Sequence, residues 1–150
     1  MKKIIIALTL LGSMYGFTQN NQNYDEALAK KVGAPDNGMK TYVFCLLTTG
    51  TNITATPEEK KKWFEGHMAN INKLASEGKL VMAGPFMKND KNYRGIFIFN
   101  CTTIEEAEKL VNSDPAVQAN LLKADLTVWY GSAALVLMDE LHKKITKTGF

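Results

Sequence analysis

The sequence predicts an α+β protein built around one four-stranded sheet. Strand-like and helix-like segments follow one another in the order β-α-β-β-α-β, the chain has 150 residues, and 45% of these are hydrophobic. A chain of this length normally forms one domain, and this apolar content is enough for one core. The sequence contains no internal repeat that would indicate a solenoid.

The first residues have the layout of a secretory leader. Lys2 and Lys3 precede an apolar run, residues 4–17, and small or polar residues follow it. The run is shorter than the ~18 residues of a membrane-spanning helix, so an uncleaved anchor is the alternative. No cysteine lies nearby for lipid attachment. We expect residues 1–19 to be a signal peptide, and the mature protein to be periplasmic or secreted without membrane contact.

The remaining chain divides into a linker and one domain. Residues 20–38 are expected to form an N-terminal linker. It contains a short helix over residues 24–32, which ends at Gly33. Residues 39–150 are expected to form the α+β domain, including a C-terminal helix.

The predicted strands are short apolar runs bounded by turn residues, and the predicted helices begin at capping residues followed by proline or acids. The strands cover residues 41–47, 80–83, 95–101 and 126–130, and the helices cover 57–77, 103–111 and 115 to about 122. A last amphipathic helix follows Ser132, with Leu137, Leu141 and Ile145 on one face. This order is the split βαβ, or ferredoxin-like, arrangement with an added C-terminal helix.

Three strands lack the alternation of a sheet with one face in water. They read YVFCLL, LVMA and GIFIF, which are nearly continuous apolar runs, and such runs indicate that both faces are covered. Because the helices cover one face, a second copy of the sheet is the simplest cover for the other, and we predict a homodimer. The alternative is a monomer in which the helix after Ser132 folds back over that face.

Charge and cysteine content exclude some functions. The formal net charge is +3, removal of Lys2 and Lys3 lowers it by two, and the other lysines are interspersed with acids, so nothing indicates nucleic-acid binding. Cys45 and Cys101 are the only cysteines. An oxidising compartment permits one disulfide between them, and two buried thiols are the alternative.

His67 is the most informative residue. At ~100° per residue, Trp63, His67, Ile71 and Leu74 fall on one side of the helix that begins at Pro57. An imidazole on an apolar face needs a hydrogen-bond partner, which a polar pocket or a backbone carbonyl would supply. His67 is therefore either a pocket residue or a core histidine.

Other candidate residues each have an ordinary structural explanation. Asp114 before Pro115 is a normal helix cap, and Gly84 with Pro85 is a normal end of a strand, although a rigid backbone can also shape a cavity wall. Three residues close the last strand and could line a pocket with apolar bulk and polar tips, or else fill core and cap the next helix. They are Trp129, Tyr130 and Ser132.

Several kinds of chemistry lack their residues. The sequence has no phosphate-binding glycine loop and no Gly-x-Ser-x-Gly turn, and two histidines with two cysteines make a poor zinc set. We therefore expect neither a metal nor a cofactor.

Short motifs in a fixed order carry a resemblance to a known family. The series is Gly66-His67-Met68, then residues 77–80 (EGKL), then Ala83-Gly84-Pro85, Gly95, and Ser113-Asp114-Pro115. Over residues 39–130 the sequence resembles the YCII-related (YciI-like) family. The leader, the linker and the segment beyond Ser132 depart from its usual pattern.

The resemblance implies a dimeric α+β barrel with a histidine and an aspartate in a cleft, here His67 and Asp114, beside Gly84 and Pro85. It also implies a cofactor-free lyase or isomerase acting on a small cyclic enol, lactone or hydroxyquinone. In that interpretation Asp114 would fix the tautomer of His67, which would move a proton. The alternatives are a non-catalytic module that binds or senses a small molecule and, third, a domain that only mediates assembly.

Overall fold

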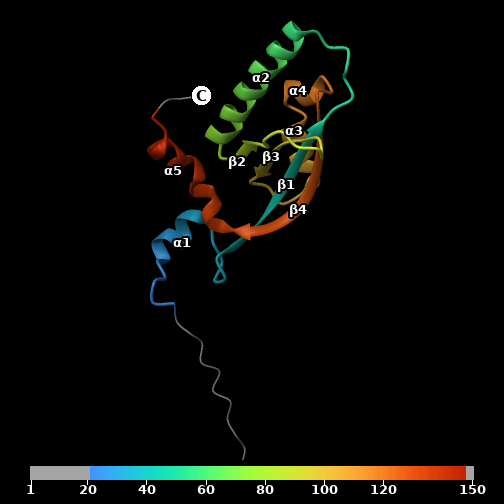
Figure 1. Cartoon of the computed structure of the whole chain (residues 1–150). Coiled ribbons are helices and arrows are strands. Elements are labelled where there is room, and N and C mark those ends of the chain that lie inside the picture. Colours follow the sequence, from blue (N-terminus) through green and yellow to red (C-terminus); the bar gives the residue numbers. More distant parts are fainter. Residues whose placement is uncertain (1–20, 148–150) are drawn as a thin grey trace, which may run out of the picture.

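The computed structural model describes residues 21–147, so the expected leader, residues 1–19, lies outside the described residues. The elements follow one another along the chain as α1 (Glu26–Val32), β1 (Met39–Thr49), α2 (Pro57–Ser76), β2 (Leu80–Pro85), β3 (Tyr93–Phe99), α3 (Ile104–Val111), α4 (Pro115–Gln118), β4 (Leu122–Ser132), the 3₁₀ helix η1 (Ala133–Leu137) and α5 (Met138–Ile145). Figure 1 shows α2 and α4 near one end of the molecule, with α1 near the other. Within residues 21–147 no helix is both long and apolar enough to cross a membrane.

The sheet has the predicted ferredoxin-like order. Its strands are arranged β2-β3-β1-β4, and every neighbouring pair is antiparallel. β1 lies between β3 and β4, so that Cys45 pairs with Phe97 on one side and with Leu126 on the other. The predicted α+β class, with helices added to a four-stranded antiparallel sheet, is confirmed.

The two faces of the sheet carry different clusters. On one face the main core gathers around Val43, Cys45, Phe97 and Phe99, and it includes residues of α2 and α3. On the other face Tyr42, Val81 and Ile98 form a smaller cluster. This separation follows from the period of two along each strand, which sends successive side chains to opposite faces.

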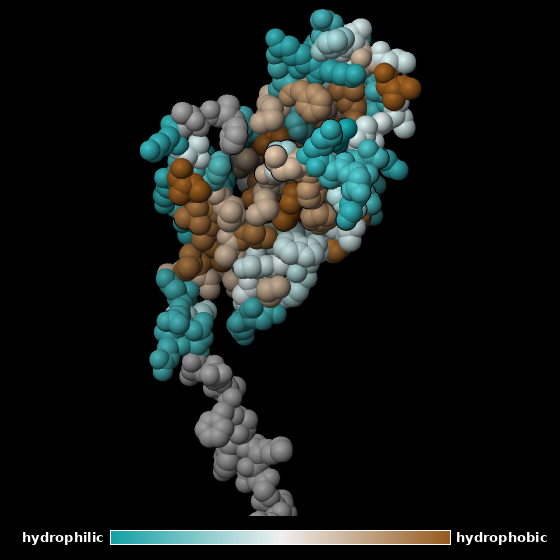
Figure 2. Space-filling model, in the orientation of Figure 1, coloured by the Kyte–Doolittle hydropathy of each residue, from teal (hydrophilic) through white to brown (hydrophobic). Residues whose placement is uncertain are grey.

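The segment after β4 covers part of the second face. Leu135 and Val136 of η1 pack against the smaller cluster. For that part of the sheet, this is the cover by a folded-back C-terminal segment that was the alternative to a dimer. Beyond η1 the apolar stripe turns outward, because Leu141 is 49% exposed and Ile145 is 80% exposed. Figure 2 shows this stripe as a hydrophobic patch on the surface beside the sheet. The C-terminal helix is thus split into a 3₁₀ turn that is packed and an α-helix that is largely solvated.

Several predicted boundaries are wrong. β1 and β4 are longer than the predicted 41–47 and 126–130, because the two strands stay paired from Met39 with Ser132 to Thr49 with Leu122, and β3 lies two residues earlier than the predicted 95–101. β2 continues through Gly84 and Pro85 rather than stopping before them, because β2 is an edge strand and its outer side needs no backbone donor from proline. α4 ends at Gln118 rather than near residue 122, because Asn120 adopts a positive φ of 54°, which asparagine tolerates, and reverses the chain into β4.

The two cysteines are separate, buried thiols. Burial raises the pKa of the Cys45 thiol to about 12 and that of the Cys101 thiol to about 11. This arrangement corresponds to the alternative of two thiols rather than a disulfide.

Candidate functional site

Helix α2 presents His67 to the sheet. The helix begins with a capping box, in which Thr56 Oγ1 accepts from the Glu59 amide and Glu59 Oε2 accepts from the Thr56 amide. Three turns further on, the His67 ring lies against the ring of Phe97 on β3, with centroids 5.8 Å apart and an interplanar angle of 29°. Only 9% of His67 is exposed, so its position on the apolar side of α2 is as the sequence predicted.

Asp114 is the polar partner that a buried imidazole requires. Its Oδ2 lies 2.6 Å from His67 Nδ1, and its Oδ1 accepts a 2.9 Å hydrogen bond from the Ala116 amide at the start of α4. Asp114 is fully buried. The aspartate therefore caps α4 with one oxygen and binds the histidine with the other.

The short distance fixes how the ring is protonated. A carboxylate can only accept hydrogen bonds, so the hydrogen between the two side chains belongs to Nδ1. The neutral ring then carries its lone pair on Nε2. Asp114 thereby selects one tautomer and one orientation of the imidazole.

Two close approaches hold α2 against the residues around Asp114. Gly66 faces Pro115 so closely that a Cβ at residue 66 would lie 2.8 Å from Pro115 Cγ. One turn further along, Ser113 Oγ lies 3.1 Å from the Asn70 side-chain amide, within hydrogen-bond distance, and 2.7 Å from the Leu110 carbonyl oxygen. These contacts flank the His67–Asp114 hydrogen bond: Gly66, Ser113 and Pro115 are next to its partners in sequence, and Asn70 is about one helical turn after His67.

The second ring nitrogen of His67 is open to the surroundings. Within residues 21–147, the His67 ring makes its hydrogen bond through Nδ1. No side-chain nitrogen or oxygen in this range is both buried from solvent and without a partner, so Nε2 is in contact with solvent. Phe64, one turn earlier on α2, lies edge-on to the imidazole at 5.7 Å and is 44% exposed. His67 thus has a buried, oriented side toward Asp114 and Phe97, and an accessible nitrogen near an exposed aromatic ring.

The structure separates the other predicted binding residues from this pair. Gly84 lies on β2 next to Ala83. Ala83 pairs with Phe97, which contacts the His67 ring, so Gly84 is linked to His67 only through these two neighbours. Trp129 lies on the opposite face, because its ring contacts Tyr42 at 6.0 Å, and Tyr42 belongs to the second cluster. The side chain of Trp129 also folds over Gly131, where a Cβ would collide with it.

The polar groups of Tyr130 and Ser132 are engaged elsewhere, Tyr130 with the linker and Ser132 with η1. The Tyr130 hydroxyl accepts a 3.0 Å hydrogen bond from Asn37 Nδ2, and Ser132 Oγ accepts from the Ala134 amide, which caps η1. The predicted ligand set is therefore not one pocket within a single chain. Strand periodicity could have shown this for Trp129. It is one residue from Tyr130 and three from Ser132 along β4, so its side chain lies on the face opposite theirs.

Sequence reasoning missed the residues that shape the surroundings of His67. Phe64 and Phe97 were not singled out, and Gly66 was noted only within the Gly66-His67-Met68 motif, although a glycine inside a long helix is a recognised indication of close packing. Phe64 is three residues before His67 on one helix. Phe97 could not be found in this way, because only the fold brings β3 beneath α2.

No cluster of three or more histidine, cysteine, aspartate or glutamate side chains suited to a metal occurs among residues 21–147. The arrangement that does occur is a carboxylate-oriented imidazole, which can accept or deliver one proton at Nε2. Fold and site together define a small ferredoxin-like α+β domain with a histidine–aspartate pair between α2 and α4.

The chain belongs to the YCII-related domain family, whose model matches residues 41–129. This confirms the resemblance seen in the sequence. Among solved structures, 5-chloro-2-hydroxyhydroquinone dehydrochlorinase from Burkholderia phenoliruptrix, in complex with 2,5-dihydroxybenzoquinone, is similar at 19% identity and a TM-score of 0.42, over 58% of this chain and 92% of that chain. That similarity is too low to assign an activity. Comparison with curated proteins finds no match.

Proposed function

We propose that this protein is a small-molecule enzyme that uses His67 to move a proton without a cofactor. The observation that carries the proposal is the 2.6 Å contact between His67 Nδ1 and a fully buried Asp114. A buried carboxylate that orients one nitrogen of an imidazole leaves the other nitrogen to act on a substrate, and general acid–base catalysis by a positioned histidine typically contributes ~10²–10⁴-fold to a rate. Asp114 acts here as a positioning residue and His67 as the catalytic one.

The substrate class is proposed by analogy with the family. We expect a small cyclic enol, a lactone or a halogenated hydroxyquinone, and a lyase or isomerase reaction. Nε2 would take a proton from a carbon or hydroxyl next to a carbonyl, and the electron pair would enter the conjugated system. Return of the proton at another atom completes an isomerisation, whereas departure of a halide with an electron pair completes an elimination. The exposed Phe64 ring beside His67 suits a planar substrate.

The second candidate function is a non-catalytic binder or sensor of small molecules. It is supported by the exposed Phe64 ring beside His67, against which a flat ligand could stack without reacting. In that case the pair would only bind and orient a ligand. A purely structural role for the domain ranks third.

The proposal is tested by solvent-deuterium incorporation. Cyclic enols, lactones and chlorinated hydroxyquinones are incubated with the protein in D₂O, and exchange or release of halide is followed by NMR and by absorbance. His67→Asn is the sharpest variant, because its amide nitrogen can replace Nδ1 as donor to Asp114 while no atom replaces Nε2. His67→Ala and Asp114→Asn accompany it, and His142→Ala on the exposed α5 is the control.

The enzymatic proposal is supported if His67→Asn abolishes turnover, Asp114→Asn lowers it, and the His142→Ala control keeps the wild-type rate. Binding without exchange, weakened equally by both site variants, supports the sensor. Turnover that persists in His67→Asn contradicts the proposal.

We further propose that the protein is exported and forms a homodimer. The leader pattern in residues 1–19 supports export, and the mass of the mature chain tests it. Half-buried apolar residues on the second face of the sheet, Phe44, Leu46 and Ile96, together with exposed Trp129, support a dimer. They lie on the same face as the cluster that η1 partly covers, and Phe44 and Trp129 border that cluster.

A further inference from the structure

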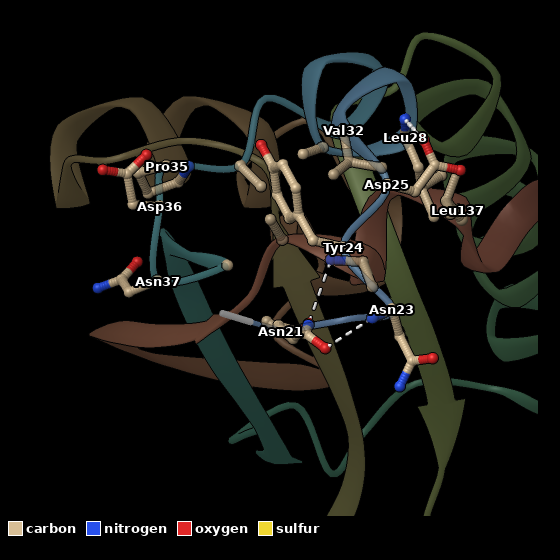
Figure 3. Close-up of a pocket in the computed structure, with 16 residues that line it drawn as sticks. Asn21, Asn23, Tyr24, Asp25, Leu28, Val32, Pro35, Asp36, Asn37 and Leu137 are labelled. Atoms are coloured by element: carbon tan, nitrogen blue, oxygen red, sulfur yellow. Dashed lines mark hydrogen bonds between the residues drawn. The ribbon is translucent and has the colours of Figure 1, made fainter. Parts of the chain in front are cut away.

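A cavity of about 350 Å³ lies outside the part of the chain that the family model matches. Every residue that lines it belongs either to residues 21–38 or to residues 132–137, whereas the family match covers 41–129. α1 and the loop after it form two walls, and the start of η1 forms the third (Figure 3). The volume is at the small end of the range of ~300–1,000 Å³ that is typical of small-molecule sites.

The walls of this cavity, which we call the accessory cavity, are tied together by specific contacts. The Ala133 amide donates a 2.9 Å hydrogen bond to the Gly38 carbonyl, which joins η1 to the loop. Asn37 is held at both ends, since its Oδ1 accepts from the Met39 amide and its Nδ2 donates to Tyr130. On the outer side Lys31 of α1 forms a 2.9 Å ion pair with Glu140 of α5. The segments around the cavity are therefore held together before any ligand enters, which lowers the entropic cost of binding.

The lining combines an apolar base with negative charge. Val32, 7% exposed, and Ala133, 1% exposed, are its most buried members, and Leu28 and Leu137 add apolar surface beside them. Two carboxylates, Asp25 and Asp36, belong to the lining, and no lysine, arginine or histidine does.

Both carboxylates retain binding capacity. Asp36 makes no side-chain hydrogen bond or ion pair within residues 21–147, and Asp25 uses Oδ1 to cap α1 at the Leu28 amide and has no further partner in that range. Two lysines adjoin this wall in sequence, Lys30 next to Ala29 and Lys31 next to Val32, and Lys31 is engaged by Glu140. The charged side chains that line the accessory cavity are all negative, which favours cations over anions there.

Tyr24 supplies an aromatic surface between these groups. Figure 3 shows its side chain between the Pro35–Asp36 loop on one side and Asp25 with Leu28 on the other. The residue is 59% exposed, so the ring face is available. An aromatic face next to carboxylates attracts organic cations, through the ring quadrupole as well as through charge.

We propose that the accessory cavity is a binding site for a small organic cation that has an apolar body, such as an aromatic or alkyl ammonium compound. The apolar body would contact Leu28, Val32 and Leu137, and the ammonium group would lie near Asp36 and the face of Tyr24. The site is separate from the His67–Asp114 pair, so it does not depend on the enzymatic proposal.

A matched series of ligands tests the charge requirement. Benzylammonium, benzyl alcohol and benzoate have nearly the same apolar body and differ in charge, and each is titrated into the full chain while backbone amide shifts are followed by NMR. Benzylammonium is expected to shift the amides of residues 24–37 and 133–137 and to bind about fivefold more tightly than benzyl alcohol, which is the effect of about 1 kcal/mol from a partly exposed charge. Benzoate is expected to bind more weakly than either.

Two variants and a control locate the effect. Asp36→Asn is expected to remove the preference for benzylammonium over benzyl alcohol, whereas Asp90→Asn, the same change in the turn between β2 and β3, is expected to leave it unchanged. Ala29→Phe fills the cavity from α1 and is expected to abolish binding of both compounds. Three results would overturn the proposal: equal affinity for benzylammonium and benzyl alcohol, amide shifts outside residues 24–37 and 133–137, or no binding of benzylammonium at about 10 mM.

Discussion

Substitution of Gly66 by alanine tests how closely the histidine and the aspartate depend on helix packing. A Cβ at residue 66 would lie 2.8 Å from Pro115 Cγ and 3.2 Å from Pro115 Cβ, whereas ordinary contact begins at 3.4 Å. Pro115 and α4 must therefore retreat by about 0.6 Å. Because Asp114 directly precedes Pro115, the same shift would stretch its 2.6 Å hydrogen bond with His67 toward the limit of about 3.2 Å for such bonds.

The expected change in stability has a sign that distinguishes packing from propensity. Alanine in place of glycine inside a helix normally stabilises by ~0.5–1 kcal/mol, whereas overpacking costs ~1–3 kcal/mol. We expect Gly66→Ala to lower the free energy of unfolding by about 1 kcal/mol, measured by urea denaturation. In the Pro115→Ala background, where the ring carbon that clashes is absent, the same substitution should cost less. Stabilisation of the wild-type background by Gly66→Ala, with the His67 ring unperturbed, would refute this reasoning.

Three other properties can be checked directly. Cys45 and Cys101 are expected to react slowly with thiol reagents at pH 8 in the native protein and rapidly in urea, because burial raises their pKa values to about 12 and about 11 and keeps both thiols protonated and covered; a thiol that reacts rapidly in the native state would contradict this. Glu140, whose pKa is lowered to about 2 first by Lys144 and then by Lys31, has a folded pKa below the ordinary 4.5, so its stabilising contact between α1 and α5 is present above pH 4.5 and is lost as the pH falls toward 2. NMR shifts of α1 amides should report that transition, and Glu140→Gln should remove it. Light scattering is expected to give a dimer that Trp129→Asp weakens, and a monomer at all concentrations would favour cover by the C-terminal segment instead.

The order of elements could be predicted because local signals agreed with the fold. The capping residue Thr56 with Pro57 marked the start of α2, and continuous apolar runs marked β1 and β3. His67 could be singled out because it lies within the apolar stripe of an otherwise amphipathic helix. Asp114 could be placed beside it only through the family resemblance, since two residues 47 positions apart carry no local indication of contact.

The remaining features depend on tertiary packing. Trp129 and Tyr130 were predicted as possible pocket lining because they close the last strand, but strand register places Trp129 on the face of the sheet opposite His67. The accessory cavity arises where residues 21–38 meet residues 132–137, and neither segment carries a pattern that predicts a cavity. The outward turn of Leu141 and Ile145 was likewise hidden, because an amphipathic pattern shows which residues share a face and not what that face contacts.

The tautomer of His67 tests the central claim most directly. Long-range ¹H–¹⁵N NMR spectra of the side chains distinguish a protonated Nδ1 from a protonated Nε2, and exposed His142 on α5 provides an internal comparison. The account predicts that neutral His67 carries its hydrogen on Nδ1, donated to Asp114, and that Asp114→Ala abolishes this preference. A hydrogen on Nε2 in the wild-type protein, or a tautomer unaffected by Asp114→Ala, would contradict it.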